Sequence, residues 1–187
     1  MFLPAGQRPG QPWRNGGGVT YEIVRAPHPR RAEDFLWRVS IAEVALPGPF
    51  SLFAGHERLI AVIDGPGMRL RGLGAADIEL RPFQVLRFDG AARVEGWLPH
   101  GTVKDLNVIF DPALCRATLT LARDGSPLRL AARITLVVNV GTASCEWHLG
   151  AQSGWLARFD ALQFTDSHTG ELQLAGTPTV ALVEIHV

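Results

Sequence analysis

The chain has 187 residues, of which 47% are hydrophobic and 19% are charged, a composition typical of a globular protein with a sizeable core. Its 18 basic and 18 acidic residues cancel at pH 7, so no bulk charge attracts it to nucleic acid or to a membrane surface. The two cysteines suggest neither a disulfide framework nor a zinc spacing, and no apolar run is long enough to span a membrane. We therefore expect a cytoplasmic protein.

The first 18 residues are rich in glycine and proline and end in the run PWRNGGG, residues 12–18. This run lacks the Gly-Lys-Ser/Thr ending of a phosphate-binding Walker loop. The triple glycine is explained either by a flexible linker or by a backbone that approaches a ligand closely. Trp13, between a proline and the glycines, is a candidate lid over a pocket.

A strand is predicted over residues 19–24, and the next one carries the clearest alternation in the chain. Trp37, Val39 and Ile41 form an apolar face, while Arg38 and Ser40 lie on the other face. The Pro-Gly-Pro run at 47–49 ends this strand because proline cannot donate to a ladder. A further apolar strand follows at 59–63 and stops at a glycine-rich turn.

Short strand-like runs continue to the end of the chain, with no helix expected beyond two turns. In the run 103–110, Leu106 and Val108 share one face, whereas Asp105 and Asn107 share the other. The predicted strands of the remaining chain are residues 68–71, 77–80, 85–88, 103–110, 117–122, 128–140, 145–149, 156–164, 171–174 and 180–187. This pattern predicts two successive all-β units that divide near residues 111–115.

The segment 48–65 resembles the first motif of the cupin barrel, in which metal-binding members place His-x-His, then Glu, then Gly. Here the same frame reads Ser51-x-Phe53, then Arg58, then Gly65. A divalent cation needs imidazole or carboxylate donors, and the guanidinium of Arg58 would repel it. We therefore expect no metal and no cofactor at this site.

Four blocks together resemble the HutD/Ves family: PWRNGGGVT at 12–20, WRVSIAEV at 37–44, GPFSLFAGHER at 48–58 and VKDLNVIF at 103–110. These proteins are bicupins associated with histidine utilisation. The resemblance implies two jelly-roll, RmlC-like antiparallel barrels, an N-terminal cupin barrel in residues 1–112 and a cupin-like barrel in 113–187. It also implies a small acidic ligand from histidine breakdown, such as a formylated glutamate.

Polar residues of the family blocks are the candidate ligand-binding site. They are Trp13, Asn15, Gly16, Gly17, Arg38, Ser40, Glu43, Ser51, Arg58, Asp105 and Asn107. The alternative is that the strand residues among them face water, because an antiparallel sheet with one solvated face needs no site. Glu43 interrupts an apolar face, so it either pairs with an arginine or lies past the strand end.

Two functions from different classes remain open. The first is a non-catalytic sensor or governor that binds a small anionic metabolite, with no nucleic-acid or membrane partner; a homodimer is the oligomeric state considered. The second is a cofactor-free isomerase or hydrolase of a small carboxylic acid that uses Glu43, Asp105 or a histidine as acid or base. The six histidines, at 28, 56, 100, 148, 168 and 186, are scattered without ligand spacing, and His28, between two prolines, is expected to be exposed. No catalytic residue is assigned.

Overall fold

A computed structural model of the chain describes residues 1–123, 125–165 and 170–187. These residues group into two compact units, residues 9–115 and residues 1–8 with 116–187. The expected all-β class is confirmed, since the single helical segment in the described ranges is a 3-10 turn, η1 (Ala5–Gln7). No helix in the described part of the chain is long and apolar enough to cross a membrane.

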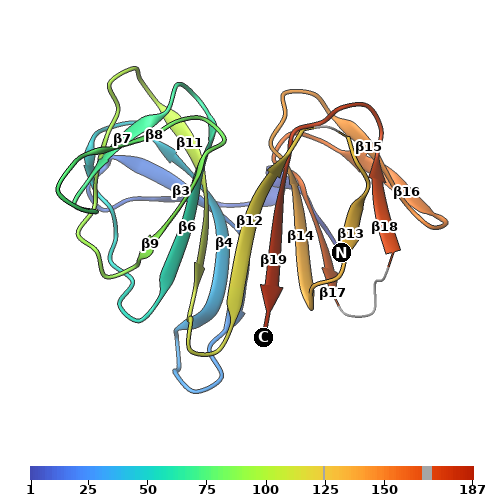
Figure 1. The fold of residues 1–187 in the computed structure, drawn as a ribbon, viewed down its shortest axis with the longest axis horizontal. Helices are drawn as coiled ribbons and strands as arrows, with labels where there is room; N and C mark the ends of the chain where they lie inside the picture. Colours follow the sequence, from blue (N-terminus) through green and yellow to red (C-terminus); the bar gives the residue numbers. More distant parts are fainter. Residues whose placement is uncertain (124, 166–169) are drawn as a thin grey trace. The chain divides into compact units, whose positions relative to one another are not determined.

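The unit of residues 9–115 consists of two antiparallel sheets (Figure 1). The six-stranded sheet has the order β2-β3-β4-β11-β6-β9, with β2 (Gly10–Pro12), β3 (Gly18–Pro27), β4 (Phe35–Val44), β6 (Glu57–Asp64), β9 (Val85–Asp89) and β11 (Val103–Phe110). The four-stranded sheet has the order β5-β10-β7-β8, with β5 (Gly48–Pro49), β7 (Met68–Arg71), β8 (Ile78–Leu80) and β10 (Glu95–Trp97). One apolar cluster joins residues from both sheets, such as Ile60 and Val62 of β6 with Leu70 of β7.

The other unit repeats this plan. Its five-stranded sheet has the order β1-β17-β14-β19-β12, with β1 (Phe2–Leu3), β12 (Arg116–Ala122), β14 (Ile134–Asn139), β17 (Ala161–Thr165) and β19 (Val180–His186). Its four-stranded sheet has the order β13-β18-β15-β16, with β13 (Leu128–Leu130), β15 (Cys145–Leu149), β16 (Gln152–Leu156) and β18 (Gly170–Leu174). A second apolar cluster, which includes Val137 and Leu172, lies between these sheets.

The first eight residues belong with the second half of the chain, whereas the sequence suggested that they open the N-terminal domain. Strand β1 pairs with β17, and the backbone N–H of Ala5 donates to Asp160 Oδ1 at 2.7 Å. Arg8 donates to the carbonyl oxygens of Phe159 and Leu3, both at 2.7 Å. The contacts of Ala5 with Asp160 and of Arg8 with Phe159 join residues 155 and 151 positions apart in the sequence, so no local pattern indicates them.

Two predicted strands are interrupted in the structure. The run 128–140 divides into β13 and β14, which lie in different sheets. The run 156–164 breaks between β16 and β17, where Phe159 takes a positive φ of 68° and Asp160 accepts a hydrogen bond from the backbone of Ala157. Polar residues stand at both breaks, Arg133 in the first run and Arg158 and Asp160 in the second, so the single strands expected over these runs are wrong.

Candidate functional site

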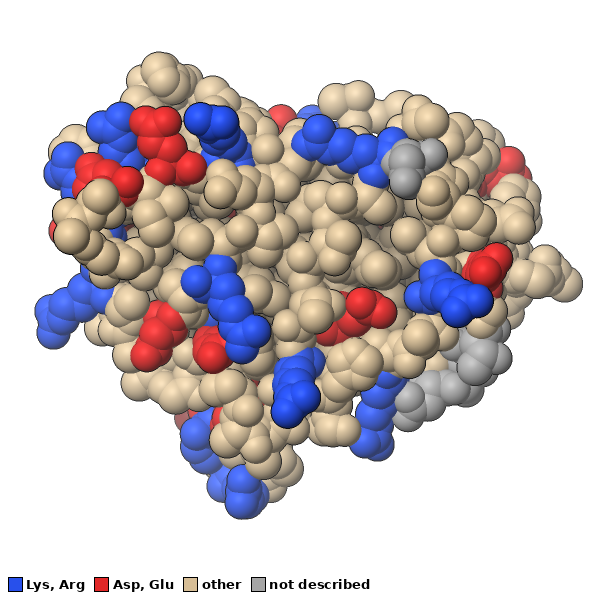
Figure 2. All heavy atoms as spheres, viewed as in Figure 1, with Lys and Arg blue, Asp and Glu red and all other residues tan. Residues whose placement is uncertain are grey.

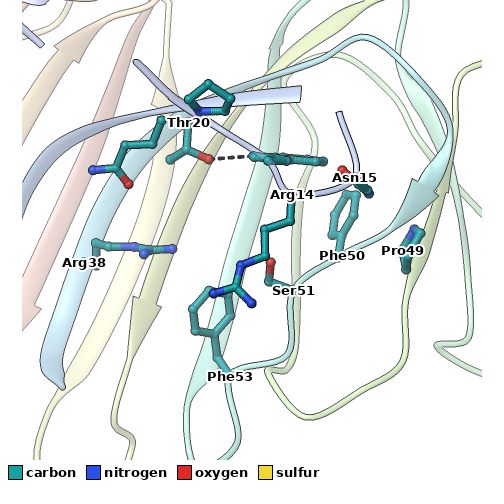
Figure 3. Close-up of a pocket in the computed structure, with 11 residues that line it drawn as sticks. Arg14, Asn15, Thr20, Arg38, Pro49, Phe50, Ser51 and Phe53 are labelled. Carbon is teal, nitrogen blue, oxygen red and sulfur yellow. Dashed lines mark hydrogen bonds between the residues drawn. The ribbon is translucent and has the colours of Figure 1, made fainter. Parts of the chain in front are cut away.

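A pocket of about 450 Å³ opens within the unit of residues 9–115 (Figure 3), and a recess of about 50 Å³ shares part of its lining. The pocket and the recess share lining residues, including Trp13, Thr20, Arg38, Phe50 and Phe53. We therefore treat the two spaces as one site, the arginine pocket. Its floor is formed by polar residues of β4, β6 and β11. The volume is that of a site for a small molecule.

Strand register explains why these polar side chains converge. Side chains alternate between the two faces of a strand, so the even-numbered positions of β4, such as Arg38 and Ser40, share one face. Asn107 of β11 pairs with Ser40, and Ile109 pairs with Arg38 on one side and with Arg58 of β6 on the other. Residues from three strands therefore meet on one face of the sheet.

A chain of hydrogen bonds connects the charged residues of the recess. Arg58 Nη2 donates to Asn107 Oδ1 at 2.5 Å, and Arg58 Nη1 donates to the carbonyl oxygen of Ser51 at 3.4 Å. The amide nitrogen of Asn107 in turn donates to Asp105 Oδ1. This pairing places the Asn107 oxygen toward the guanidinium. The Nε of Arg58 is buried and has no hydrogen-bond partner among the described residues.

Burial shifts the pKa values of Arg58 and Asp105, the two ionisable residues at the ends of this series of hydrogen bonds. Desolvation lowers the pKa of Arg58 to about 10, an effect that Asp105 opposes and Arg38 reinforces. Desolvation also raises the pKa of Asp105 to about 7, although Arg58 and the Asn107 hydrogen bond favour its ionised form. The recess therefore holds a permanent guanidinium beside a carboxyl group that titrates near neutral pH.

Aromatic rings surround both guanidinium groups. The Arg58 guanidinium carbon lies 5.2 Å from the Phe50 ring centroid, 5.6 Å from that of Phe53 and 5.1 Å from that of Phe88. The Arg38 guanidinium lies 5.0 Å from the ring centroids of both Phe53 and Phe35. Ring faces attract a cation but accept no conventional hydrogen bond, so the rings leave the Nε donors of Arg38 and Arg58 unsatisfied.

Arg38 makes no hydrogen bond with any described residue, and its Nε is buried without a partner. Desolvation lowers the pKa of Arg38, while Glu22 opposes this and Arg25 adds to it. A guanidinium remains charged at neutral pH even so. The pocket thus presents two cations whose donors are incompletely satisfied.

The turn between β2 and β3 carries the wall of the pocket mouth. Trp13 Nε1 donates to Thr20 Oγ1 at 2.8 Å, and the Trp13 ring lies edge-on to Phe50 with centroids 6.3 Å apart. Figure 3 shows this hydrogen bond at the top of the pocket, with Arg14 and Asn15 beside it. The hydrogen bond orients the indole across the opening.

The glycines of this turn have distinct roles. Gly16 has a positive φ of 69°, which favours glycine. A Cβ on Gly18 would lie 2.4 Å from the carbonyl oxygen of Glu43 and 3.2 Å from the Trp13 ring. Gly17 has neither constraint, although its carbonyl accepts hydrogen bonds from the backbones of Ala45 and Leu46. The run is therefore a structured turn and not a flexible linker.

Eight of the eleven candidate residues line the arginine pocket. They are Trp13, Asn15, Arg38, Ser40, Ser51, Arg58, Asp105 and Asn107. The three that do not line it are Gly16, Gly17 and Glu43. Glu43 is an odd-numbered residue of β4, so its side chain lies on the opposite face from Arg38 and Ser40. It forms an ion pair with its cross-strand neighbour Lys104 and not with an arginine.

Thr20, Phe53 and Arg14 line the pocket but were not among the sequence candidates. The position of Thr20 could have been inferred from strand alternation, since it pairs with Ala42 on the pocket face of β4. In the sequence, Phe53 stands out only because it occupies the place of a cupin metal ligand. Arg14 stands between the candidates Trp13 and Asn15 in the first family block, and this position could have singled it out.

None of the described histidines, at 28, 56, 100, 148 and 186, lines the arginine pocket; His168 lies outside the described residues. The expectation that His28 is exposed is wrong, since it is 9% exposed. Its Nδ1 accepts hydrogen bonds from the backbones of Arg30 and Arg31, and its Nε2 lies 3.2 Å from Asp111 Oδ2. This ring therefore braces the β3–β4 loop.

The residues in the cupin metal frame do not fit a metal ion. Arg58 points into the recess where a carboxylate ligand would be needed, and Phe53 offers no donor atom. In the described part of the chain, no three His, Cys, Asp or Glu side chains gather in a group that could hold a metal. That the protein binds no metal stays a prediction.

The paired sheets and the central pocket define a cupin-like all-β protein. The fold is similar to that of the bacterial pirin YhhW from Escherichia coli, solved in complex with nickel(II), with a TM-score of 0.64 at 11% identity over 98% of this chain and 97% of that one. At this identity the likeness concerns the fold alone.

The HutD family model matches residues 5–182, so the chain belongs to the HutD family. It is 34% identical to the conserved protein PA5104 of Pseudomonas aeruginosa over 100% of this chain and 98% of that one, with a TM-score of 0.85. It is 32% identical to HutD from Pseudomonas fluorescens SBW25, solved in a formate condition, over 100% and 97% of the chains, also with a TM-score of 0.85.

Curated relatives support the HutD/Ves assignment. The chain is 41% identical to an uncharacterised Pseudomonas putida protein in the hutC 3' region, over 64% of this chain and 62% of that protein. It is 40% identical to protein Ves of Citrobacter koseri, over 59% of this chain and 57% of Ves. The match thus spans less than two thirds of either relative's length.

Proposed function

We propose that this protein is a metal-free bicupin that binds a small acidic metabolite of histidine catabolism in the arginine pocket. The observation that carries the proposal is the pair of guanidinium groups, Arg38 and Arg58, in one recess with unsatisfied Nε donors. A buried guanidinium that lacks acceptors is costly, and a carboxylate supplies them in bidentate geometry. Asp105 offers at most one compensating charge.

The polar floor suits the other end of such a ligand. Ser40 is buried at 2% exposure and faces the recess beside Asn107, so a hydroxyl and an amide are available to an acyl or amide group. A formylated glutamate has both features, carboxylates and a formyl amide. The location of one relative's gene, in the hutC 3' region, supports this compound class.

A non-catalytic role as a sensor or governor is the form of this proposal that we favour, because no described histidine and no metal donor set lies in the pocket. We further propose that each unit corresponds to one jelly-roll half of a bicupin, because each has two antiparallel sheets around its own core. A cytoplasmic location and a homodimer remain part of the proposal.

The test is a thermal-shift panel with histidine, urocanate, formimino-glutamate, formyl-glutamate and glutamate. A ligand at a hundredfold excess over its Kd stabilises the native state by about 2.7 kcal/mol. For a chain of this size that should raise the Tm by several degrees. We expect formyl-glutamate to give the largest shift.

Matched variants assign the shift to the pocket. Arg58→Ala should abolish it, whereas Arg129→Ala, an exposed arginine of the other unit, should leave it unchanged. Equal shifts from neutral or cationic compounds, or a full response from Arg58→Ala, would contradict the anion-pocket proposal.

One observation favours a second function. Asp105 has its pKa raised to about 7 by burial and lines the recess, which suits a general acid or base of a cofactor-free hydrolase or isomerase. Incubation with formyl-glutamate and detection of formate by NMR separates the two functions. Release of formate that Asp105→Asn abolishes would establish the enzyme, and unchanged substrate would support the binding protein.

A further inference from the structure

A second pocket, of about 520 Å³, lies beside β5, β7 and β10 in the unit of residues 9–115. We name it the β10 pocket; its walls include Leu52, Arg71, Gly72, Arg93, Val94 and Glu95. Pro49 and Phe50 also line the arginine pocket, but neither Arg38 nor Arg58 reaches the β10 pocket. The proposed metabolite site therefore does not account for it.

A close backbone approach builds one wall of the β10 pocket. Gly72 has a positive φ of 93°, and a Cβ added to it would lie only 2.0 Å from the carbonyl oxygen of Arg93. Glycine alone allows the end of β7 to pass this near to the start of β10. The wall is thus held by the backbone and does not depend on flexible side chains.

The charged residues of this pocket differ in whether their side chains already have an ion-pair or hydrogen-bond partner. Arg71 is engaged, because its Nε lies 3.0 Å from Asp77 Oδ2 and its guanidinium lies 4.4 Å from the Trp97 ring centroid. The side chains of Arg93 and Glu95 form no hydrogen bond or ion pair with any residue that the structure describes. Arg71 is the cross-strand neighbour of Glu95 and is committed to Asp77, so Glu95 keeps its acceptors.

Arg93 lies two residues before Glu95, the first residue of β10, and both residues are exposed. They flank Val94, which is 1% exposed and packs in the core, so the alternating side chains on either side of it face outward. In an extended segment, residues two apart are about 6–7 Å apart. A free cation and a free anion are thus presented together at the edge of one pocket.

The remaining wall is apolar. Leu52 is 52% exposed, and it lines the pocket together with Pro49. A ligand with an apolar group would cover this surface. A simple anion would face Glu95, and a simple cation would face two arginines, so neither matches the charge pattern.

From this arrangement we infer that the β10 pocket binds a small zwitterion, an α-amino acid with an apolar side chain. Its carboxylate is held by the Arg93 guanidinium, its ammonium group by Glu95, and its side chain by Leu52. The pocket is open and the ionic contacts are solvated, so the affinity is modest, with a Kd on the order of 1 mM.

The test is a titration of the full-length protein with L-leucine, followed by amide chemical shifts in ¹H–¹⁵N NMR spectra. We expect saturable shifts at residues 50–52, 71–72 and 93–95. L-Leucinamide lacks the carboxylate, and N-acetyl-L-leucine lacks the ammonium group; each should bind at least about tenfold more weakly, since each loses one charge-assisted contact. Equal binding of all three compounds would overturn the zwitterion assignment.

Variants separate this site from the arginine pocket. Arg93→Ala and Glu95→Gln should each weaken L-leucine binding, whereas Arg129→Ala and Arg58→Ala should not. The converse is expected for formyl-glutamate, which Arg58→Ala affects and Arg93→Ala does not. Absence of saturable shifts with L-leucine, or shifts confined to residues of the arginine pocket, would overturn the inference and leave the metabolite proposal standing.

Discussion

Arg58 shows at the scale of single residues how a buried charge depends on its neighbours. Arg58 is 6% exposed, and its guanidinium donates hydrogen bonds to Asn107 and to the Ser51 carbonyl oxygen. Three phenylalanine rings surround the guanidinium. Asp105 supports this arrangement indirectly, since it holds the amide of Asn107 with its oxygen toward the guanidinium. Each of these residues is thus constrained by the others.

The first residue-scale prediction concerns pH and Asp105. Its folded-state pKa is raised to about 7, whereas an unfolded Asp titrates near pH 4, so the folded state binds an extra proton between these values. Stability should therefore fall as pH rises through this window and level off above it. We expect a loss on the order of a few kcal/mol in wild type, measured by urea unfolding.

Asp105→Asn removes the titrating group, so most of this slope should vanish in the variant. Glu171→Gln, an exposed carboxylate in the other unit, is the control and should keep the wild-type slope. An unchanged slope in Asp105→Asn would show that another group is responsible.

The second residue-scale prediction concerns the glycine run. Gly18→Ala places a methyl group 2.4 Å from the Glu43 carbonyl oxygen and should destabilise the protein by about 1–3 kcal/mol. Gly17→Ala meets only the Asn15 side chain, at 3.3 Å, and should cost less. Chemical denaturation of the two variants provides the comparison, and equal losses would contradict it.

At the scale of elements, the β2–β3 turn links the backbone to the pocket mouth. In the turn backbone, Trp13 N–H donates to the Gly18 carbonyl oxygen and Gly16 N–H donates to the Trp13 carbonyl oxygen. The Trp13 side chain donates to the Thr20 hydroxyl. The turn therefore sets the position of the indole. Because the indole also faces Phe50, which directly follows β5, the turn and the end of β5 form the mouth together.

Removing the Trp13–Thr20 hydrogen bond tests the lid. Thr20→Val keeps the shape of residue 20 but removes the acceptor, at a cost of about 0.5–1.5 kcal/mol. We expect the affinity for formyl-glutamate to fall about 2–10-fold, mainly through faster dissociation. Thr20→Ser keeps the hydroxyl and should retain the affinity; stopped-flow measurements would distinguish the two variants, and equal rates would argue against a lid.

At the scale of the whole molecule, the chain forms two all-β units, and one of them consists of two separate segments, residues 1–8 and 116–187. Residues 1–8 complete the sheet that β12, β14, β17 and β19 form, while the unit of residues 9–115 carries the arginine pocket. Stability of the two units is therefore separable by experiment, because each has its own apolar cluster.

Deletion of residues 1–8 should destabilise the unit that contains residues 116–187. It exposes the edge of β17 and removes the acceptors and donors that Leu3, Ala5 and Arg8 supply. Hydrogen–deuterium exchange should quicken at residues 161–163, and residues 59–62 of the other unit should stay protected. Arg8→Ala alone should give a smaller effect, and uniform loss of protection would contradict this division.

The sequence alone determined features that depend on neighbouring residues. Alternation in 37–44 and 103–110 predicted strands with a polar face, because side-chain period is a local property of a strand. Asp111-Pro112 marked the end of β11 at Phe110 for an equally local reason. The four family blocks likewise identified the HutD family and eight residues of the pocket.

Only the tertiary structure decided which of these local features meet. The contacts of Arg58 with Asn107, of Glu43 with Lys104, and of Ala5 with Asp160 join residues 49, 61 and 155 positions apart. Such pairings depend on strand order and on register, and a shift of one residue would send Arg38 and Ser40 to the other face. Burial of His28 and the raised pKa of Asp105 depend on the same packing, because desolvation exists only once the sheets have come together.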